Sequence, residues 1–256
     1  MSNPFELSAR KTWPTTFFFR VWQDHPRYAP AIIEHLYEAK QRQSTEIASK
    51  VAVGAKSAQG LYESPFDLFD DPAPVLLPLR GFIVASLCMA ASRVNGGSIP
   101  PDRLAVEFEA SWYHITNRGG FHDAHYHPGC SWCGIYYLQA GDSAGGSEGA
   151  PGNGVNRFYS PISTGGHHSD YGANYLSSNR IDITPQDGLL FIFPSYLLHS
   201  ALPYQGARDR VILSFNARID PADDEESPEP VDAPAADRPA PQPRSTDRSK
   251  ETIPWK

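Results

Sequence analysis

A short segment of the chain concentrates side chains that bind metals. Residues 121–138, FHDAHYHPGCSWCGIYYL, contain three of the nine histidines and two of the three cysteines, and they end in an apolar run. His125 and His127 stand two positions apart, which in an extended chain places both side chains on one face. Two imidazoles on one face can bind a single metal ion. The cysteines point instead to a thiol redox or zinc motif, so two kinds of site compete.

Cys130 and Cys133 have the spacing of a CxxC motif. Redox motifs of this kind place the first cysteine at a helix N-terminus, where the helix dipole lowers its pKa. Here the pair precedes a predicted strand. A structural zinc site would need a second pair of ligands, and only Cys88 remains. The sequence therefore favours the histidine site over thiol chemistry.

Two downstream residues complete a pattern with the histidine pair. His199 follows an apolar run 72 positions (199−127) after His127, and Arg210 opens the run RVILSFN eleven positions (210−199) later. A double-stranded β-helix requires this order, because the mouth of its barrel gathers ligands from separate strands. Arginine can hold a carboxylate with two parallel hydrogen bonds. Three ligands on one face of a metal leave positions open for a bidentate co-substrate and for O₂.

The second half of the chain has the periodicity of strands. From Leu104 onward, short runs rich in β-branched and aromatic residues alternate with Gly, Pro, Asn and Ser. These runs are LAVEFEASWYHI, CGIYYLQA, GLLFIFP and RVILSFNARI. Several strands without helices between them are typical of a sandwich or barrel. We expect a mainly β fold, with a double-stranded β-helix (jelly-roll) core and N-terminal supporting helices.

Composition divides the chain into three parts. Residues 1–103 predict a support packed on the core, with a strand at FFFRVW (17–22), a helix opening at Pro30 and a second helix from about Leu76 to Arg93. Residues 104–219 form the predicted catalytic core. Residues 220–256 are rich in Pro, Ala and charge, and they predict a disordered tail. The Gly- and Ser-rich stretch 141–179 predicts a long loop, which either closes over the substrate or is an insert without contacts to the site.

Bulk properties exclude several classes of partner. The net charge is −7 and no stripe of Lys and Arg occurs, so we expect no nucleic acid. No apolar run approaches the roughly 18 residues of a membrane span, so we expect no membrane. Three cysteines and the lack of a signal-peptide pattern predict a reduced, cytoplasmic protein. The expected partners are a small-molecule substrate and O₂, and the sequence is compatible with a homodimer.

Four motifs in order resemble the 2-oxoglutarate/Fe(II)-dependent oxygenase superfamily over about residues 109–216. They are HYHP (125–128), CGIYYL (133–138), FPSYLLH (193–199) and DRVILSFN (209–216). The resemblance implies a jelly-roll core, Fe(II), 2-oxoglutarate as co-substrate, and succinate and CO₂ as products. On this reading His125, His127 and His199 bind the metal, and Arg210, Ser214 and Tyr137 bind 2-oxoglutarate. We expect hydroxylation of a small or amino-acid-like substrate, with His122, Asn117 and His168 as candidate substrate contacts.

One position departs from the superfamily's usual pattern, which places Asp or Glu two residues after the first histidine. Here that residue is His127. Three ligands are compatible with the departure: His127 itself, Asp123, or water or an anion, as in the superfamily's halogenases. We favour His127, because it has the required spacing and imidazole suits iron. Two other functions stay open, namely a cupin-like three-His dioxygenase without 2-oxoglutarate and a non-catalytic metal-binding jelly-roll module.

Overall fold

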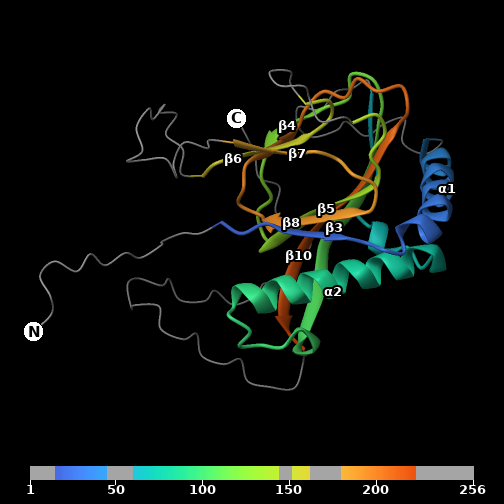
Figure 1. The fold of residues 1–256 in the computed structure, drawn as a ribbon. Helices are drawn as coiled ribbons and strands as arrows, with labels where there is room; N and C mark the ends of the chain where they lie inside the picture. Colours follow the sequence, from blue (N-terminus) through green and yellow to red (C-terminus); the bar gives the residue numbers. More distant parts are fainter. Residues whose placement is uncertain (1–14, 45–59, 144–151, 162–179, 223–256) are drawn as a thin grey trace, which may run out of the picture. The chain divides into compact units, whose positions relative to one another are not determined.

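The chain folds into two antiparallel sheets and two long helices (Figure 1). The computed structural model describes residues 15–44, 60–143, 152–161 and 180–222, and the predicted tail from residue 223 lies outside them. The helices are α1 (His25–Ser44) and α2 (Leu77–Val94), and single 3₁₀ turns occur at Leu68–Asp70, Pro74–Leu76 and Pro101–Arg103. The strands are β1 (Phe18–Val21), β2 (Leu61–Glu63), β3 (Leu104–Thr116), β4 (His122–His125), β5 (Trp132–Gln139), β6 (Asn156–Tyr159), β7 (Arg180–Ile183), β8 (Leu189–Pro194), β9 (His199–Ala201) and β10 (Arg210–Pro221).

The strand order is that of a double-stranded β-helix. The larger sheet has the order β1-β8-β5-β10-β3-β2, and the smaller has the order β4-β9-β6-β7. Along the chain, β3, β5, β8 and β10 enter the larger sheet, whereas β4, β6, β7 and β9 enter the smaller one. The chain therefore winds back and forth between two facing sheets, as in a jelly roll. This confirms the mainly β fold class and the jelly-roll core.

The side chains of β10 point alternately into two hydrophobic cores. Val211, Leu213 and Phe215 join the core that contains residues of α1 and α2, whereas Ile212 joins the core that lies between the sheets. Because successive side chains of a strand point to opposite faces, Arg210 and Ser214 lie on the same face as Ile212. Figure 1 shows α2 running along the larger sheet, across β3 and β10. The helices thus cover one face of the sheet and leave its other face to the site.

Helix α1 begins earlier than the sequence predicts. It starts at His25, and the backbone carbonyl of Asp24 accepts the first N–H bonds, from Arg27 and Tyr28. Pro30, predicted as the opening residue, lies inside the helix. Proline there removes one backbone hydrogen bond. Ile32 is fully buried in the helix–sheet core, and such packing of one helix face supplies most helical stability in proteins.

The stretch 141–179 is not all loop. Its residues 156–159 form β6, which pairs with both β7 and β9 in the smaller sheet. The predicted loop was wrong there because Asn156 and Phe158 alternate inward in a strand of only four residues, bordered by Gly-rich sequence. Residues 144–151 and 162–179 of this stretch lie outside the described residues, so its closure over the substrate stays a prediction. At the C-terminal boundary, β10 continues to Pro221, two residues beyond the predicted limit of the core.

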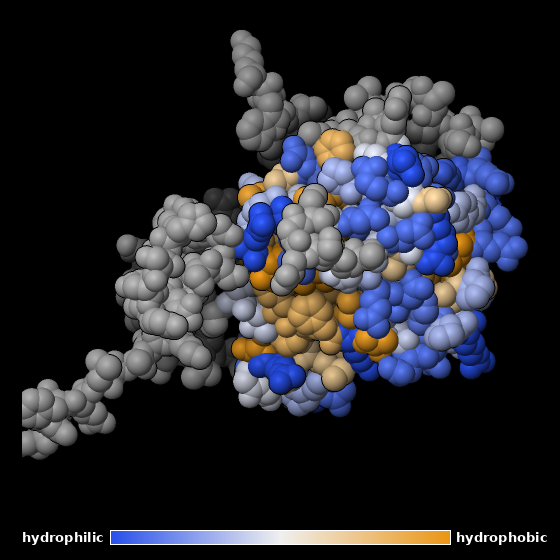
Figure 2. All heavy atoms as spheres, turned by 45° about the horizontal axis from the view of Figure 1, so that its top comes forward, coloured by the Kyte–Doolittle hydropathy of each residue, from blue (hydrophilic) through white to orange (hydrophobic). Residues whose placement is uncertain are grey.

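Helix α2 corrects the expectation that no apolar stretch reaches the length of a membrane span. Pro74–Val94 is long and apolar enough by length and composition, with a mean hydropathy of 1.8. Half of this apolar stretch is buried within the protein, and Leu79, Ile83 and Leu87 pack into the helix–sheet core. Figure 2 shows mostly polar residues on the face it draws, with an apolar area among them. The lack of a membrane partner stays a prediction.

Gly134 and Gly81 provide a matched test of this packing. A Cβ added at Gly134 in β5 would lie 2.1 Å from the ring of Phe215, whereas one added at Gly81 in α2 would meet nothing within 4 Å. We expect Gly134→Ala to lower the free energy of unfolding by about 1–3 kcal/mol, because overpacking displaces a buried ring. Gly81→Ala should raise it by about 0.5–1 kcal/mol through helix propensity. Urea denaturation measures both, and equal shifts in one direction would contradict the packing of β5 on β10.

Candidate metal centre

Three histidines converge at the end of the smaller sheet. The pairing of β4 with β9 sets His125 directly opposite His199, and His127 follows two residues beyond β4. The backbone N–H of His127 donates to the carbonyl of Ser195, which fixes this short segment beside β8. One ligand atom from each of the three imidazoles lies within 4.8 Å of the other two. A single ion placed among them could therefore bind all three.

Burial keeps two of these imidazoles neutral. His199 is 3% exposed, and its Nδ1–H donates to the carbonyl of Leu197 at 2.9 Å. Burial, together with the nearby His125 ring, lowers the pKa of His199 to about 3 and the pKa of His127 to about 4. A hydrogen bond from Nδ1 orients the ring and leaves Nε2 with its lone pair for a metal. At neutral pH the imidazoles of His127 and His199 are therefore uncharged and can bind a cation.

Asp123 does not enter the cluster. Its carboxylate accepts the N–H of Ala124 at 2.7 Å, and the residue is exposed. Its backbone carbonyl lies 2.7 Å from Nδ1 of His125, and that nitrogen is also 2.7 Å from Nδ1 of His122. Of the two protein side chains considered for the third position, the structure brings His127 to the other histidines. His122 lies against His125, as a neighbour of the cluster.

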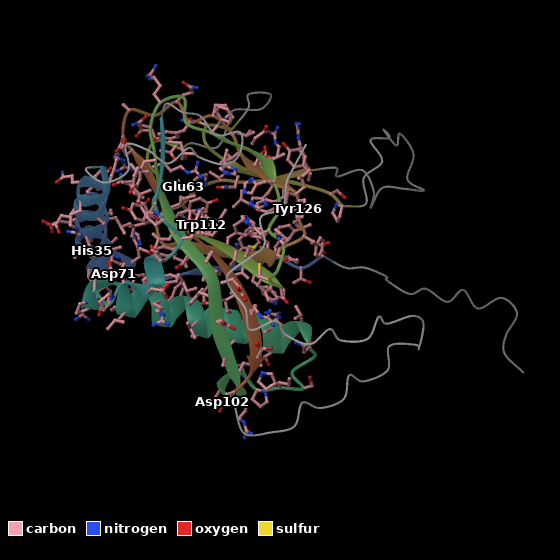
Figure 3. All side chains as sticks on the ribbon, turned by 180° about the vertical axis from the view of Figure 1, so that it is seen from behind. His35, Glu63, Asp71, Asp102, Trp112 and Tyr126 are labelled. Atoms are coloured by element: carbon pink, nitrogen blue, oxygen red, sulfur yellow. The ribbon has the colours of Figure 1, made fainter. Side chains whose placement is uncertain are left out.

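A cavity of about 450 Å³ lies in front of the three histidines. Toward the space between the sheets it is lined by Asn156, Ile212 and Ser214, and elsewhere by Glu63, His114, His122, Phe66 and Trp112. Glu63 accepts a 2.7 Å hydrogen bond from Nε2 of His114, and both side chains are mostly buried. Figure 3 labels Glu63 and Trp112 together over β2 and β3, whereas His35 and Asp71 lie apart from them, beside α1.

The wall formed by β2 and β3 was missed by the sequence reasoning. The sequence assigned no role in the site to His114, Glu63, Phe66 or Trp112. Their contacts join segments that lie some 50 residues apart in the chain, as in the pair His114–Glu63, separated by 51 positions. The only available signal was a polar residue at an inward-facing position of a predicted strand.

Arg210 is a buried cation that contacts a residue of the cavity wall, Asn156. Its side chain is 1% exposed, and Nη2 donates to Oδ1 of Asn156 at 3.0 Å. The same oxygen accepts a 2.8 Å hydrogen bond from the hydroxyl of Tyr137, whose ring centroid lies 6.0 Å from the guanidinium carbon. Because arginine can only donate, the oxygen of Asn156 must face it, which leaves the amide nitrogen turned elsewhere.

The surroundings of Arg210 fit a carboxylate ligand. Burial lowers the pKa of Arg210, and within the described residues no carboxylate pairs with it. Its Nε is buried and makes no hydrogen bond to the part of the chain that the structure describes. A buried charge without a counter-charge is unfavourable, and an added carboxylate would pair with the guanidinium. The three histidines supply neutral nitrogen ligands that suit Fe(II). The donor set therefore fits both groups.

The other predicted contacts lie in different places. Ser214 lines the cavity, and Tyr137 faces the core between the sheets rather than the helices, although neither Tyr137 nor Arg210 forms part of the cavity wall. His122 lines the cavity. Asn117 is exposed beyond the end of β3 and is not part of the lining, so the structure does not bring it to the site. His168 lies outside the described residues.

Comparison with known families identifies the segment that carries these residues. Residues 110–216 match the family model described as "Putative 2OG-Fe(II) oxygenase". The resemblance to the 2-oxoglutarate/Fe(II)-dependent oxygenase superfamily is confirmed. The matched residues run from β3 to β10 and include the three histidines and Arg210. No curated protein sequence matches the chain.

Solved structures of oxygenases are similar to the chain at low identity. A prolyl-4-hydroxylase from Pseudomonas putida is 17% identical over 80% of this chain and 92% of its own, with a TM-score of 0.44. A prolyl hydroxylase from Trichoplax adhaerens is 15% identical over 78% of this chain and 83% of its own, with a TM-score of 0.47. An oxidoreductase of the 2OG-Fe(II) oxygenase family from Burkholderia pseudomallei is 12% identical, with a TM-score of 0.33. The match covers 45% of this chain and 46% of the Burkholderia protein. At such identities no substrate transfers from these proteins to this chain.

Proposed function

We propose that the protein is a non-haem oxygenase that uses Fe(II), 2-oxoglutarate and O₂. In this proposal His125, His127 and His199 hold the iron, and Arg210 binds the distal carboxylate of 2-oxoglutarate. The observation that carries the proposal is the buried guanidinium of Arg210, which has no carboxylate partner among the described residues and bonds Asn156 of the cavity wall. The family match of residues 110–216 supports the same assignment.

The chain's own residues bind, orient and exclude water in this scheme. Bound iron with 2-oxoglutarate supplies the oxidising chemistry. Asn156 and Tyr137 hold the guanidinium of Arg210 in place, and Ser214 adds a hydroxyl to the cavity wall nearby. Phe158 stacks on the ring of His199 at a centroid distance of 5.1 Å, and this apolar contact shields the ligand from water.

The substrate is proposed to be a small or amino-acid-like molecule, and the reaction a hydroxylation. A cavity of about 450 Å³ lies within the range of small-molecule sites. Phe66 and Trp112 offer aromatic surface with ring centroids 5.2 Å apart, and the Glu63–His114 pair offers polar groups beside it. His122, next to His125, is placed to contact the same molecule.

An anaerobic titration tests this function directly. Fe(II) is added to the protein with and without 2-oxoglutarate, and the visible charge-transfer band of the chelate is recorded. We expect the band only when both are present, and consumption of 2-oxoglutarate to succinate after O₂ is admitted. Iron binding without any band on addition of 2-oxoglutarate would contradict the proposal.

The three-His ligand set favours a second candidate, a cupin-like dioxygenase that does not use 2-oxoglutarate. In that case the cavity would admit an organic substrate directly to the iron, and Arg210 would have only a structural role. Turnover that persists in an Arg210→Met variant would favour this second candidate. A purely structural metal is less compatible with the geometry, because structural ions fill their coordination positions with protein ligands and this cluster supplies three.

Asn156 provides a further test of the carboxylate site. We expect Asn156→Asp to weaken 2-oxoglutarate binding by about tenfold to a hundredfold, because the new carboxylate would pair with Arg210 and compete with the ligand. The same pair should raise the melting temperature of the protein without ligand. Iron affinity should not change. The amplitude of the charge-transfer band against 2-oxoglutarate concentration measures the effect.

Asn153→Asp is the matched control for this variant. It adds the same charge in the segment just before β6, where the Asn153 side chain makes an exposed hydrogen bond to the carbonyl of Asp142. We expect its 2-oxoglutarate affinity to stay close to that of the wild type. If Asn156→Asp also bound 2-oxoglutarate normally, the distal carboxylate would have to lie elsewhere.

A further inference from the structure

Cys130 and Cys133 lie in contact at the start of β5, beside the metal cavity. Sγ of Cys130 and Sγ of Cys133 are 3.9 Å apart, and Cys133 lines the cavity beside Asn216. Cys133 is 2% exposed, and its thiol donates to Oδ1 of Asn216 at 3.2 Å. Cys130 is only half-buried. The pair therefore combines a half-buried cysteine with a buried one, and their sulfurs are in van der Waals contact.

We propose that Cys130 and Cys133 form a peroxide-reactive dithiol, in which Cys130 is the attacking thiolate and Cys133 the resolving thiol. The Cys130 thiolate attacks one oxygen of hydrogen peroxide, which breaks the O–O bond, forms a sulfenic acid and releases hydroxide. Cys133 then attacks the oxidised sulfur, its proton joins the departing hydroxyl group, and a disulfide and water form. Both electrons of the reduction come from the two sulfurs.

The local environment sets the roles of the two sulfurs. The thiol of Cys133 and the hydroxyl of Ser195 lower the pKa of Cys130 to about 7 despite partial burial. The hydrogen bond to Cys130 and burial both raise the pKa of Cys133. A thiolate is the reactive form, so Cys130 reacts first.

The segment before Cys130 leaves room for the bond to close. A disulfide requires about 2.05 Å between sulfurs, so the two must approach by roughly 2 Å. Gly129, at φ +86°, is exposed and has nothing within 4 Å of its Cβ position. Cys133 lies in β5, paired with β8 and β10, so the movement falls on Cys130 and its exposed neighbours.

Peptide mapping of the full-length chain tests the proposal without iron or 2-oxoglutarate, so its outcome is independent of the proposed function. Reduced protein is kept with a chelator, treated with hydrogen peroxide, alkylated with iodoacetamide and digested with trypsin. Residues 119–157 form one tryptic fragment that contains Cys130 and Cys133, whereas residues 81–93 contain Cys88. Cys88 is buried, and burial raises its pKa, so it serves as an internal control.

We expect the 119–157 fragment to lose two hydrogen atoms and escape alkylation after peroxide, while Cys88 shows no oxidation. In Cys133→Ser, a cyclic diketone should trap the sulfenic acid on Cys130. In Cys130→Ser, neither product should form. Full alkylation of Cys130 and Cys133 in peroxide-treated wild type, or oxidation of Cys133 at an unchanged rate in Cys130→Ser, would overturn the proposal. The wild-type result stands even if a variant fails to fold.

Discussion

A His199→Ala variant is expected to lose Fe(II) binding almost completely. His199 lies close to both other histidines, with ring centroids 4.3 Å from His125 and 5.2 Å from His127. Removing it leaves two nitrogen ligands on adjacent parts of the chain. The loss of affinity should exceed the roughly 10–100-fold that follows loss of a group outside the ligand set. Dialysis against Fe(II) under anaerobic conditions, followed by an iron assay, measures the change.

His35→Ala is the matched control for this measurement. His35 lies on α1, and its Nε2 bonds to a carboxylate oxygen of Asp71 at 2.8 Å, away from the cavity. The control removes an imidazole without touching the cluster, so its iron content should equal that of the wild type. Circular dichroism would establish that both variants are folded. Iron retained by folded His199→Ala at the wild-type level would disprove the metal site.

The convergence of the three histidines was largely predictable from the sequence. His125 and His127 stand two positions apart beside a strand, and His199 follows a later strand, so a fold that alternates between two sheets had to bring them together. The alternation of β10 similarly placed Arg210 and Ser214 on the face opposite Val211 and Leu213. These are local, period-two patterns in apolar runs, which a single sequence displays directly.

Other features depended on contacts that no local pattern reveals. The Glu63–His114 pair forms only because β2 pairs with the C-terminal end of β3, which sets Glu63 opposite His114. Strand β6 has four residues and borders Gly-rich sequence. It forms a strand because it pairs with β7 on one side and β9 on the other. Helix α1 includes Pro30 because packing of Ile32 and Leu36 outweighs a lost backbone bond. In each case tertiary context overrides the local preference.

The electrostatic state of Arg210 could not be read from its position in the chain. The spacing of Arg210 from His199 indicated that its side chain points between the sheets. Spacing does not show whether a glutamate or aspartate side chain pairs with it. The structure gives Arg210 an amide oxygen and an aromatic ring as neighbours. The absence of a paired carboxylate among the described residues is what distinguishes a ligand-binding arginine from one in a structural ion pair.

An Arg210→Met variant is therefore expected to lose 2-oxoglutarate while keeping iron. Removing one partner of a buried charge pair costs about 2–5 kcal/mol, which corresponds to a loss of affinity of at least about 30-fold. Arg210→Lys keeps the charge but loses the planar donor fork, so it should lie between the wild type and Arg210→Met. The charge-transfer band at increasing 2-oxoglutarate, with Fe(II) fixed and O₂ excluded, gives the three affinities.

Stability measurements on the same variants separate a binding role from a structural one. A structural ion-pair arginine would destabilise the protein when replaced, because its partner would be left buried and unpaired. Arg210 has no such partner in the described residues, and Oδ1 of Asn156 would keep its hydrogen bond from Tyr137. We therefore expect Arg210→Met, without ligand, to unfold at a temperature equal to or above that of the wild type.

The control is Arg218→Met on the same strand. The Arg218 guanidinium lies 3.5 Å from Glu109 at a half-exposed position, so this variant should bind 2-oxoglutarate normally. A large drop in melting temperature for Arg210→Met, with 2-oxoglutarate affinity unchanged, would assign Arg210 to the fold and leave the cupin-like reaction as the better account.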